Sequence, residues 1–154
     1  MNQTAQIRES RSAIVKSTSV CLAIEDAFRL FTTDISIWWP LSTHSVFGED
    51  AIACYLEGKV DGRIYELHKD RHQSDWGKVL LWEPPHRLVF TLHPGRTAEY
   101  ATEVEVTFQE QAGGTLLTLT HRGWERCGGQ MLPERAGYER GWEIILLKYV
   151  RQAG

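Results

Sequence analysis

The chain has 154 residues, of which 42% are hydrophobic and 24% are charged. This composition is too apolar for a disordered protein, and the length fits one domain that buries a sizeable core without disulfides. The net charge of -3 and the scattered basic residues exclude a general attraction to nucleic acid or to an anionic membrane.

The opening segment, residues 1–15, is polar and mixed in charge and lacks the apolar core of a secretory signal. No segment approaches the roughly 18 consecutive apolar residues of a membrane span. The cysteines Cys21, Cys54 and Cys127 have no C-x-x-C spacing, which favours reduced thiols. We therefore expect one cytoplasmic domain over residues 1–154, with an ordered core over about 12–151.

The first predicted strand covers residues 13–22, where weak alternation and many Val, Ile, Ser and Thr residues are typical of an edge strand. The period then changes to that of a short amphipathic helix. Its apolar positions are Ile24, Ala27, Phe28 and Phe31. A second helical turn is predicted over residues 35–39, with Asp34 as its N-cap and Pro40 discouraging its continuation.

Strands dominate the middle of the sequence. Short apolar or alternating runs between turn residues predict them at 51–57, 63–68, 76–82, 88–92, 102–109 and 115–122. The glycines of the 58–62 connection stand where a hairpin needs positive φ. Two adjacent prolines make residues 83–86 a rigid turn. Consecutive strands joined in this way predict a meander sheet.

The last predicted element is a helix over about 134–151. Large side chains recur there at helical spacing, at Tyr138, Trp142, Ile145, Leu146 and Tyr149. Ile144 and Leu147 lie outside this stripe and predict a helix enclosed on more than one side. At 1.5 Å per residue the helix is about 27 Å long, so it can cross a whole sheet. Gly137 and Gly141 weaken it by up to ~1 kcal/mol each relative to Ala.

The order of strand, two short helices, six strands and long helix predicts an α+β protein. Its curved antiparallel sheet of about seven strands would wrap around the long C-terminal helix. One helix cannot fill a strongly curved sheet, so we expect an apolar cavity between the two, which is a usual kind of small-molecule site.

Four segments carry a resemblance to a known family. They are EGKVDGRIYE at 57–66, WGKVLLWEPPHRLVFT at 76–91, GTLLTLTHRGW at 114–124 and GYERGW at 137–142. With these segments the chain resembles the START-like (SRPBCC) superfamily, and within it the family related to the C-terminal domain of the activator of the heat-shock chaperone ATPase. The pattern departs from that family at Gly58, where relatives often carry Pro, and at Asp61, where Gly is common.

The resemblance implies a helix-grip fold and an internal pocket. It does not imply one activity, because relatives bind lipids, hormones or polyketides and a few catalyse cyclisation. The chaperone activator also engages its partner through a separate N-terminal domain, for which this chain has no room. Chaperone activation is therefore not expected from the resemblance.

The polar candidates for the site are two acids and one histidine. Glu57 and Glu66 flank the 58–62 hairpin and match acidic positions of the family, so both could bind a ligand if they point inward. They could equally be surface or structurally bonded acids. His121 is either a polar group at the cavity mouth or a histidine bonded to the backbone. His68 and His72 lie on a predicted strand and turn rather than a helix, so we predict no metal site and no cofactor.

Aromatic residues are the apolar candidates. Trp38, Trp39, Trp76, Trp124 and Trp142, with Ile145 and Tyr149, are predicted to line the cavity, and an indole N–H there could orient a polar ligand atom. The alternative is that these side chains are plain core. We expect Trp142 in the core with one edge to the cavity, and Trp38 and Trp39 at the cavity rim.

The first functional hypothesis is a non-enzymatic carrier or sensor of a small, largely apolar or amphipathic molecule, acting as a monomer or homodimer. The second is an enzyme of the polyketide cyclase or dehydratase type that uses a buried carboxylate or His121 as general acid or base. The third is a module that interacts with a chaperone. No nucleic-acid partner and no membrane span are expected.

Overall fold

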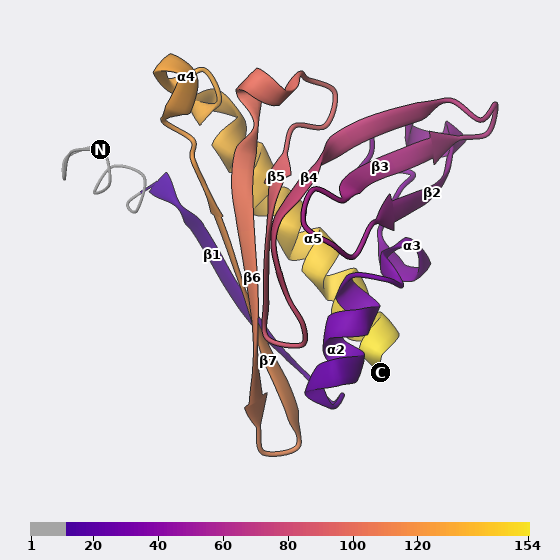
Figure 1. Cartoon of the computed structure of the whole chain (residues 1–154), viewed down its shortest axis with the longest axis vertical. Helices are drawn as coiled ribbons and strands as arrows, with labels where there is room; N and C mark the ends of the chain where they lie inside the picture. The colour runs from indigo at the N-terminus through magenta and orange to yellow at the C-terminus, as the bar shows by residue number, and fades with distance from the viewer. Residues whose placement is uncertain (1–11) are drawn as a thin grey trace.

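The computed structural model describes residues 12–154; residues 1–11, which make up most of the polar opening segment, and the side chain of Cys127 are outside the described part. Seven antiparallel strands form one sheet in the order β1-β7-β6-β5-β4-β3-β2 (Figure 1). The strands are β1 (Ile14–Val20), β2 (Ala51–Leu56), β3 (Arg63–His68), β4 (Gln73–Glu83), β5 (Arg87–Leu92), β6 (Thr102–Gln111) and β7 (Gly114–Arg122). The predicted meander is confirmed, and β1 is an edge strand as predicted.

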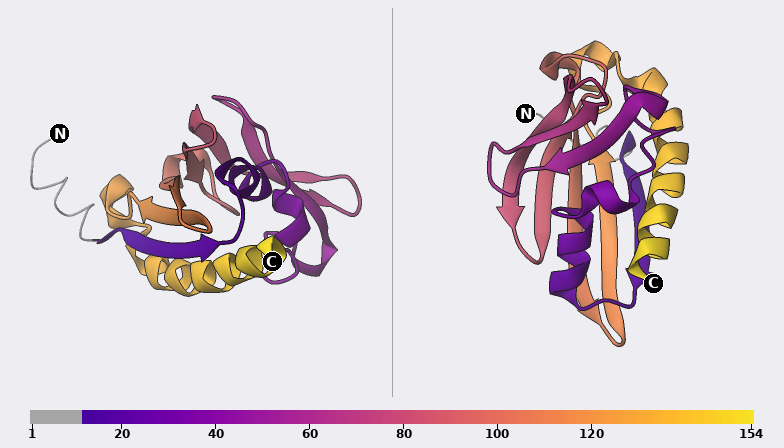
Figure 2. Two further views of the ribbon diagram at one scale, coloured as in Figure 1. Left: turned by 90° about the horizontal axis from the view of Figure 1, so that it is seen from below. Right: turned by 90° about the vertical axis from the view of Figure 1, so that its right-hand side faces the viewer.

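Four α-helices and three 3₁₀ turns accompany the sheet in the described residues. The helices are α2 (Ile24–Phe31), α3 (Ile35–Trp38), α4 (Arg126–Gly129) and α5 (Arg135–Ala153), and the 3₁₀ turns are η1 (Gly48–Asp50), η2 (Ala98–Tyr100) and η3 (Leu132–Glu134). Seen end-on in the left panel of Figure 2, the sheet curves around the helices and α5 runs beside β1 along its open side. This arrangement confirms the predicted α+β helix-grip class.

Helix α2 packs its apolar stripe into the curve of the sheet. All four apolar positions predicted from its spacing are buried. Phe28 and Phe31 meet Phe108 of β6 edge-on, with ring centroids 5.2 and 6.1 Å apart. The hydroxyl of Tyr149 on α5 donates to the carbonyl oxygen of Ala27 at 2.7 Å. Burying each large side chain contributes about 1.5–3 kcal/mol, so α2 fastens α5 to the sheet.

One prediction about α5 is wrong. Trp142, Ile145 and Tyr149 are buried as predicted, but Ile144 and Leu147 are 46% and 48% exposed. The helix closes the open side of a half-closed sheet, so its outer side faces solvent (Figure 2). It is therefore not enclosed on more than one side.

Two local predictions also need correction. Asp34 occupies the N-cap position of α3 but makes no side-chain capping hydrogen bond, because its φ of -100° and ψ of 22° differ from the extended backbone of a capping residue. In the 58–62 turn, positive φ falls on Asp61 rather than on a glycine. Gly62 is needed for space instead, since a Cβ there would lie 2.3 Å from the carbonyl oxygen of Glu57.

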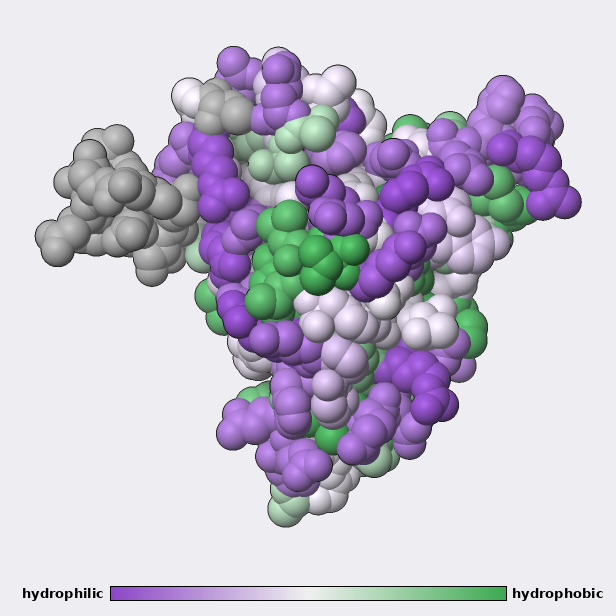
Figure 3. Space-filling view, in the orientation of Figure 1, coloured by the Kyte–Doolittle hydropathy of each residue, from purple (hydrophilic) through white to green (hydrophobic). Residues whose placement is uncertain are grey.

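Ion pairs join neighbouring strands on the outer face of the sheet. Arg122 on β7 donates to Glu103 and Glu105 on β6, in both cases at 2.7 Å. Figure 3, in the orientation of Figure 1, shows hydrophilic residues around a hydrophobic area near β4 and β5. Among the described residues no helix has the length and apolar character needed to cross a membrane.

Candidate functional site

A pocket of about 390 Å³ lies between the first half of α5, the loop that follows α3, and the sheet at β4 and the end of β5. Its volume falls in the lower part of the range of small-molecule sites. Four of the ten residues predicted for the site line it: Trp39, Trp76, Trp142 and Ile145.

Three tryptophans far apart in the sequence form the aromatic walls. Trp39 follows α3, Trp76 is on β4 and Trp142 is on α5. The ring centroid of Trp39 lies 5.1 Å from that of Trp76 and 5.9 Å from that of Trp142. The fold thus assembles one continuous aromatic surface from three separate elements.

The indole N–H groups of these three walls are all used inside the protein. Trp39 Nε1 donates to the carbonyl oxygen of His44 at 2.8 Å, Trp76 Nε1 to Glu66 Oε1 at 2.6 Å, and Trp142 Nε1 to His121 Nδ1 at 2.9 Å. An indole has a single donor and no acceptor. The walls therefore offer ring faces and edges to a ligand, and the predicted use of an indole N–H to orient it does not fit these three residues.

Glu66 stands behind the aromatic wall, fully buried. Besides the bond from Trp76, its carboxylate accepts the backbone N–H groups of Val46 at 2.6 Å and Phe47 at 3.0 Å. Three donors satisfy the charge and make the burial of this acid possible. Because Val46 also lines the pocket, Glu66 holds the loop that forms one pocket wall.

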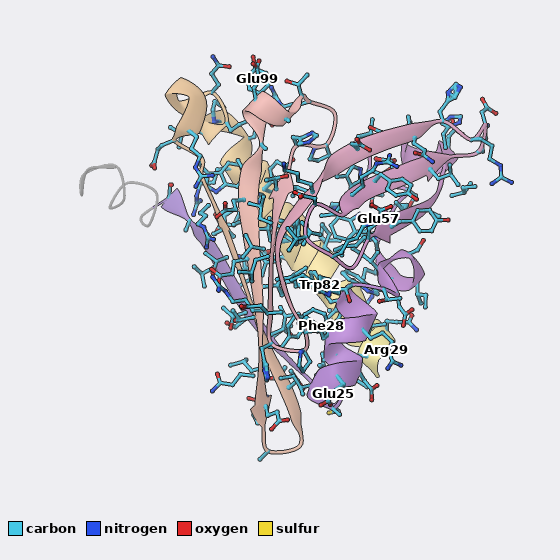
Figure 4. The ribbon with its side chains drawn as sticks, in the orientation of Figure 1. Glu25, Phe28, Arg29, Glu57, Trp82 and Glu99 are labelled. Carbon is cyan, nitrogen blue, oxygen red and sulfur yellow. The ribbon has the colours of Figure 1, made fainter. Side chains whose placement is uncertain are left out.

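Glu57 does not join Glu66. It follows β2 at the hairpin (Figure 4), half-buried, and its Oε1 accepts the backbone N–H of Arg63 at 2.7 Å. The structure therefore brings together no pair of carboxylates from these two acids, and Glu57 lies outside the pocket lining. The question of which way each acid points, left open by the strand pattern, is answered by these contacts.

His121 on β7 is also fully buried and couples α5 to the sheet. Since Trp142 Nε1 can only donate, His121 Nδ1 is the acceptor and carries no proton. His121 Nε2 lies 2.6 Å from Thr102 Oγ1, and this hydroxyl donates to the carbonyl oxygen of Leu92 at 3.2 Å. This series of hydrogen bonds fixes the neutral Nε2–H tautomer of His121, and burial lowers the pKa of His121 to about 3.

The remaining predicted site residues lie in the core and outside the pocket lining. Trp38 Nε1 donates to the carbonyl oxygen of Leu30 at 2.7 Å, and Trp124 Nε1 donates to that of His121 at 3.0 Å. Tyr149 is fastened to α2 as described above. The aromatic pattern that identifies core residues in the sequence cannot separate them from wall residues, because both kinds are large and apolar.

Several residues that line the pocket are not among those predicted from the sequence. Gly137 and Gly141 face the pocket from α5, one helical turn apart. A Cβ at Gly137 would meet nothing within 4 Å, and one at Gly141 would first meet His44 Cδ2 at 3.6 Å. The two glycines, which the sequence presents only as weak points of the helix, create room. The i, i+4 spacing of glycines on an otherwise large-residue helix was the signal that could have located the pocket.

The titratable groups of the pocket are held neutral in its interior and charged at its rim. Partial burial lowers the pKa of His44. Burial, and then the charge of Glu134, raise the pKa of Tyr138 to about 12. Glu134 at the rim is exposed and pairs with Arg96 at 3.1 Å. Near pH 7 the interior is thus uncharged and mostly aromatic, which suits an apolar guest.

Three other features of the described residues concern further kinds of site. A second hollow of about 320 Å³ lies between α2 and the β4–β5 turn, where Phe28 and Trp82 meet edge-on at 5.1 Å (Figure 4). In the described residues no group of three or more His, Cys, Asp or Glu side chains is placed to hold a metal ion. Burial, then the charge of Glu66, raise the pKa of the Cys54 thiol to about 12, so this free thiol stays protonated.

Comparison with known proteins agrees with the fold and the pocket-forming elements. The family model described as Activator of Hsp90 ATPase homolog 1-like protein matches residues 22–149. The chain belongs to this family. The matched residues extend from just before α2 to near the end of α5 and so include every element that contributes to the pocket. No curated protein matches the sequence.

Solved structures of similar fold belong to distant relatives. Protein MLL2253 from Mesorhizobium loti shares 18% identity over 90% of this chain and 94% of its own, with a TM-score of 0.63. The Aha1 dimer from Colwellia psychrerythraea shares 18% identity over 90% and 92%, with a TM-score of 0.62. CalU16 from Micromonospora echinospora shares 20% identity over 90% and 71%, with a TM-score of 0.59. These likenesses show the fold of the chain.

Proposed function

We propose that this protein is a non-enzymatic carrier or sensor that binds a small, largely apolar molecule in the pocket beside α5. The observation that carries the proposal is the convergence of Trp39, Trp76 and Trp142 around about 390 Å³, with every wall N–H already bonded inside the protein. Contact between this surface and an apolar ligand is favourable, and it leaves no indole N–H of the three walls without a hydrogen bond. The free thiols of Cys21 and Cys54 fit the cytoplasmic location proposed with it.

The enzymatic alternative is less well supported. A general acid or base must come within hydrogen-bonding reach of its substrate. Glu66 is surrounded by three protein donors, and both ring nitrogens of His121 are bonded. Neither group is exposed, so the two residues proposed for that role are occupied by structural bonds. The chaperone-module hypothesis rests on the family name alone.

The test of the proposal fills the pocket from α5 and leaves the buried hydrogen bonds of Glu66 and His121 in place. We choose Gly141→Leu, because Gly141 lines the pocket and a side chain there would occupy space beside His44, another lining residue, and because leucine is a better helix former than glycine. Arg140→Leu is the matched control, since Arg140 is exposed on the same helix and outside the lining. Trp142→Ala is a poorer choice, because it also leaves His121 Nδ1 unpaired and a cavity in the core.

The measurement is calorimetric titration with 2-methoxynaphthalene as an apolar probe. We expect binding to the wild type and to Arg140→Leu, and a loss of at least ten-fold in Gly141→Leu, with all three proteins folded by circular dichroism. The absence of wild-type binding, or equal binding to folded Gly141→Leu, would refute the proposal. Native mass spectrometry of freshly purified protein would add the mass of any retained ligand and the oligomeric state.

A further inference from the structure

Two polar atoms of residues that line the pocket make no hydrogen bond to any described residue: Nε2 of His44 and the hydroxyl oxygen of Tyr138. The other polar side chains there are engaged. Ser45 Oγ donates to the carbonyl oxygen of Leu41 at 2.6 Å and accepts the N–H of Gly48 at 2.9 Å. Glu134 is paired at the rim. A ligand inside the aromatic walls therefore has few polar groups to meet.

His44 is held in place from two sides. Its carbonyl oxygen accepts the indole N–H of Trp39 at 2.8 Å, and its ring lies over the α5 backbone at Gly141. A Cβ at Gly141 would stand 3.6 Å from His44 Cδ2 and 3.9 Å from His44 Nε2. The glycine thus leaves the space into which the imidazole fits. The ring forms part of the pocket wall rather than a freely turning side chain.

The contacts of His44 allow the tautomer in which Nδ1 carries the proton. Nδ1 lies 2.7 Å from Thr43 Oγ1, and the same hydroxyl is in position to donate to the carbonyl oxygen of Pro40 at 3.4 Å. A hydroxyl has one hydrogen, so donation to Pro40 leaves Thr43 Oγ1 to accept Nδ1–H. Nε2, which lies beside the lining residue Gly141, then carries a lone pair. Partial burial keeps the ring neutral near pH 7, since it lowers the pKa of His44.

We propose that His44 Nε2 accepts a hydrogen bond from a hydroxyl or N–H group of the ligand, so that the pocket selects planar apolar molecules that carry one such donor. The selection rests on the proposed function, because it acts on a ligand already enclosed by the aromatic walls. A neutral hydrogen bond of this kind contributes a preference of roughly three- to ten-fold. His44 then determines specificity in a pocket whose walls are mostly apolar, with the Tyr138 hydroxyl as the other polar group free of hydrogen bonds to described residues.

The experiment compares 2-naphthol with 2-methoxynaphthalene, which share the ring system and differ in the donor. Calorimetry is run on the wild type, on His44→Phe, which keeps an aromatic ring and removes both nitrogens, and on Arg140→Leu as the unrelated control. We expect the wild type and Arg140→Leu to prefer 2-naphthol by roughly three- to ten-fold. In His44→Phe we expect this preference for 2-naphthol to be lost.

The outcomes separate this inference from the proposed function. Binding of neither probe to the wild type would remove the function itself. Equal binding of both probes to the wild type, a preference for 2-methoxynaphthalene, or an unchanged preference in His44→Phe would overturn the role of His44 and leave the function standing. If His44→Phe does not fold, the ¹⁵N shift of His44 Nε2 in the wild type serves instead. It moves upfield with 2-naphthol if the nitrogen accepts a hydrogen bond, and an unmoved signal contradicts the inference.

Discussion

The buried His121 makes a specific prediction about stability in acid. Its pKa is about 3 in the folded protein because burial disfavours the charged ring, whereas an unfolded chain has a histidine pKa of about 6.5. Between these values the unfolded state binds one proton more than the folded state. The free energy of unfolding therefore falls as the pH drops below about 6.5, and the contribution is fully present above it.

The size of the effect follows from the two pKa values. Their whole difference corresponds to roughly 5 kcal/mol, of which about 2 kcal/mol is lost by pH 5. The matched variant is His121→Gln, because an amide can accept from Trp142 Nε1 through its oxygen and donate to Thr102 Oγ1 through its nitrogen. It keeps the hydrogen-bonded chain and removes the titration.

The assay is urea denaturation of both proteins at pH 7.5, 6 and 5. Other titrating groups, such as His44 and Glu105, change both proteins alike, so the difference between them isolates His121. We expect the wild type to lose about 2 kcal/mol more than His121→Gln between pH 7.5 and 5. Parallel pH profiles for the two proteins would show that this reasoning about the buried ring is mistaken.

Three further predictions concern single contacts. Glu66→Gln turns an amide donor toward groups that are themselves donors and should lower the free energy of unfolding, measured in urea, by about 1.5–3 kcal/mol. In this variant the 43–47 loop should become the first site of limited proteolysis. Unchanged cleavage would show that Glu66 does not anchor the loop. Tyr149→Phe loses the bond to Ala27 and should lower the free energy of unfolding by about 1 kcal/mol. An unchanged denaturation midpoint would contradict this prediction. Gly137→Ala, open to space in the structure, should raise the free energy of unfolding by up to ~1 kcal/mol, and a loss would mean the helix is strained there.

Much of the fold could be predicted because periodicity is a local property. The spacing that identifies α2 also identifies its four buried residues, and the period of two in 102–109 gives the buried face of β6. The exposure of Ile144 and Leu147 could not be predicted in this way. It depends on which side of α5 the curved sheet leaves open, which is a property of the whole molecule.

The site was harder to predict than the fold. Trp39, Trp76 and Trp142 were among the candidates, but the sequence gives no means of separating them from Trp124, which is equally large and lies in the core. Glu66 matched a family position and lies inside, yet its partners are backbone N–H groups of a loop about twenty residues earlier in the chain. Contacts of this kind leave no local pattern. The glycines of α5 carry the space of the pocket and have a spacing that could have located it, whereas His44, which carries its polarity, has no distinctive pattern in the sequence.

The most direct test of ligand binding at the aromatic walls is a ¹⁵N–¹H spectrum of the indole N–H groups during titration with 2-naphthol. The internal hydrogen bonds of Trp39, Trp76 and Trp142 make their signals sharp reporters of the pocket, while Trp82, packed on Phe28, serves as the distant reference. We predict saturable shifts of the three wall signals with that of Trp82 unmoved. Shifts centred on Trp82, or none at the walls when the probe is in large excess, would contradict the account.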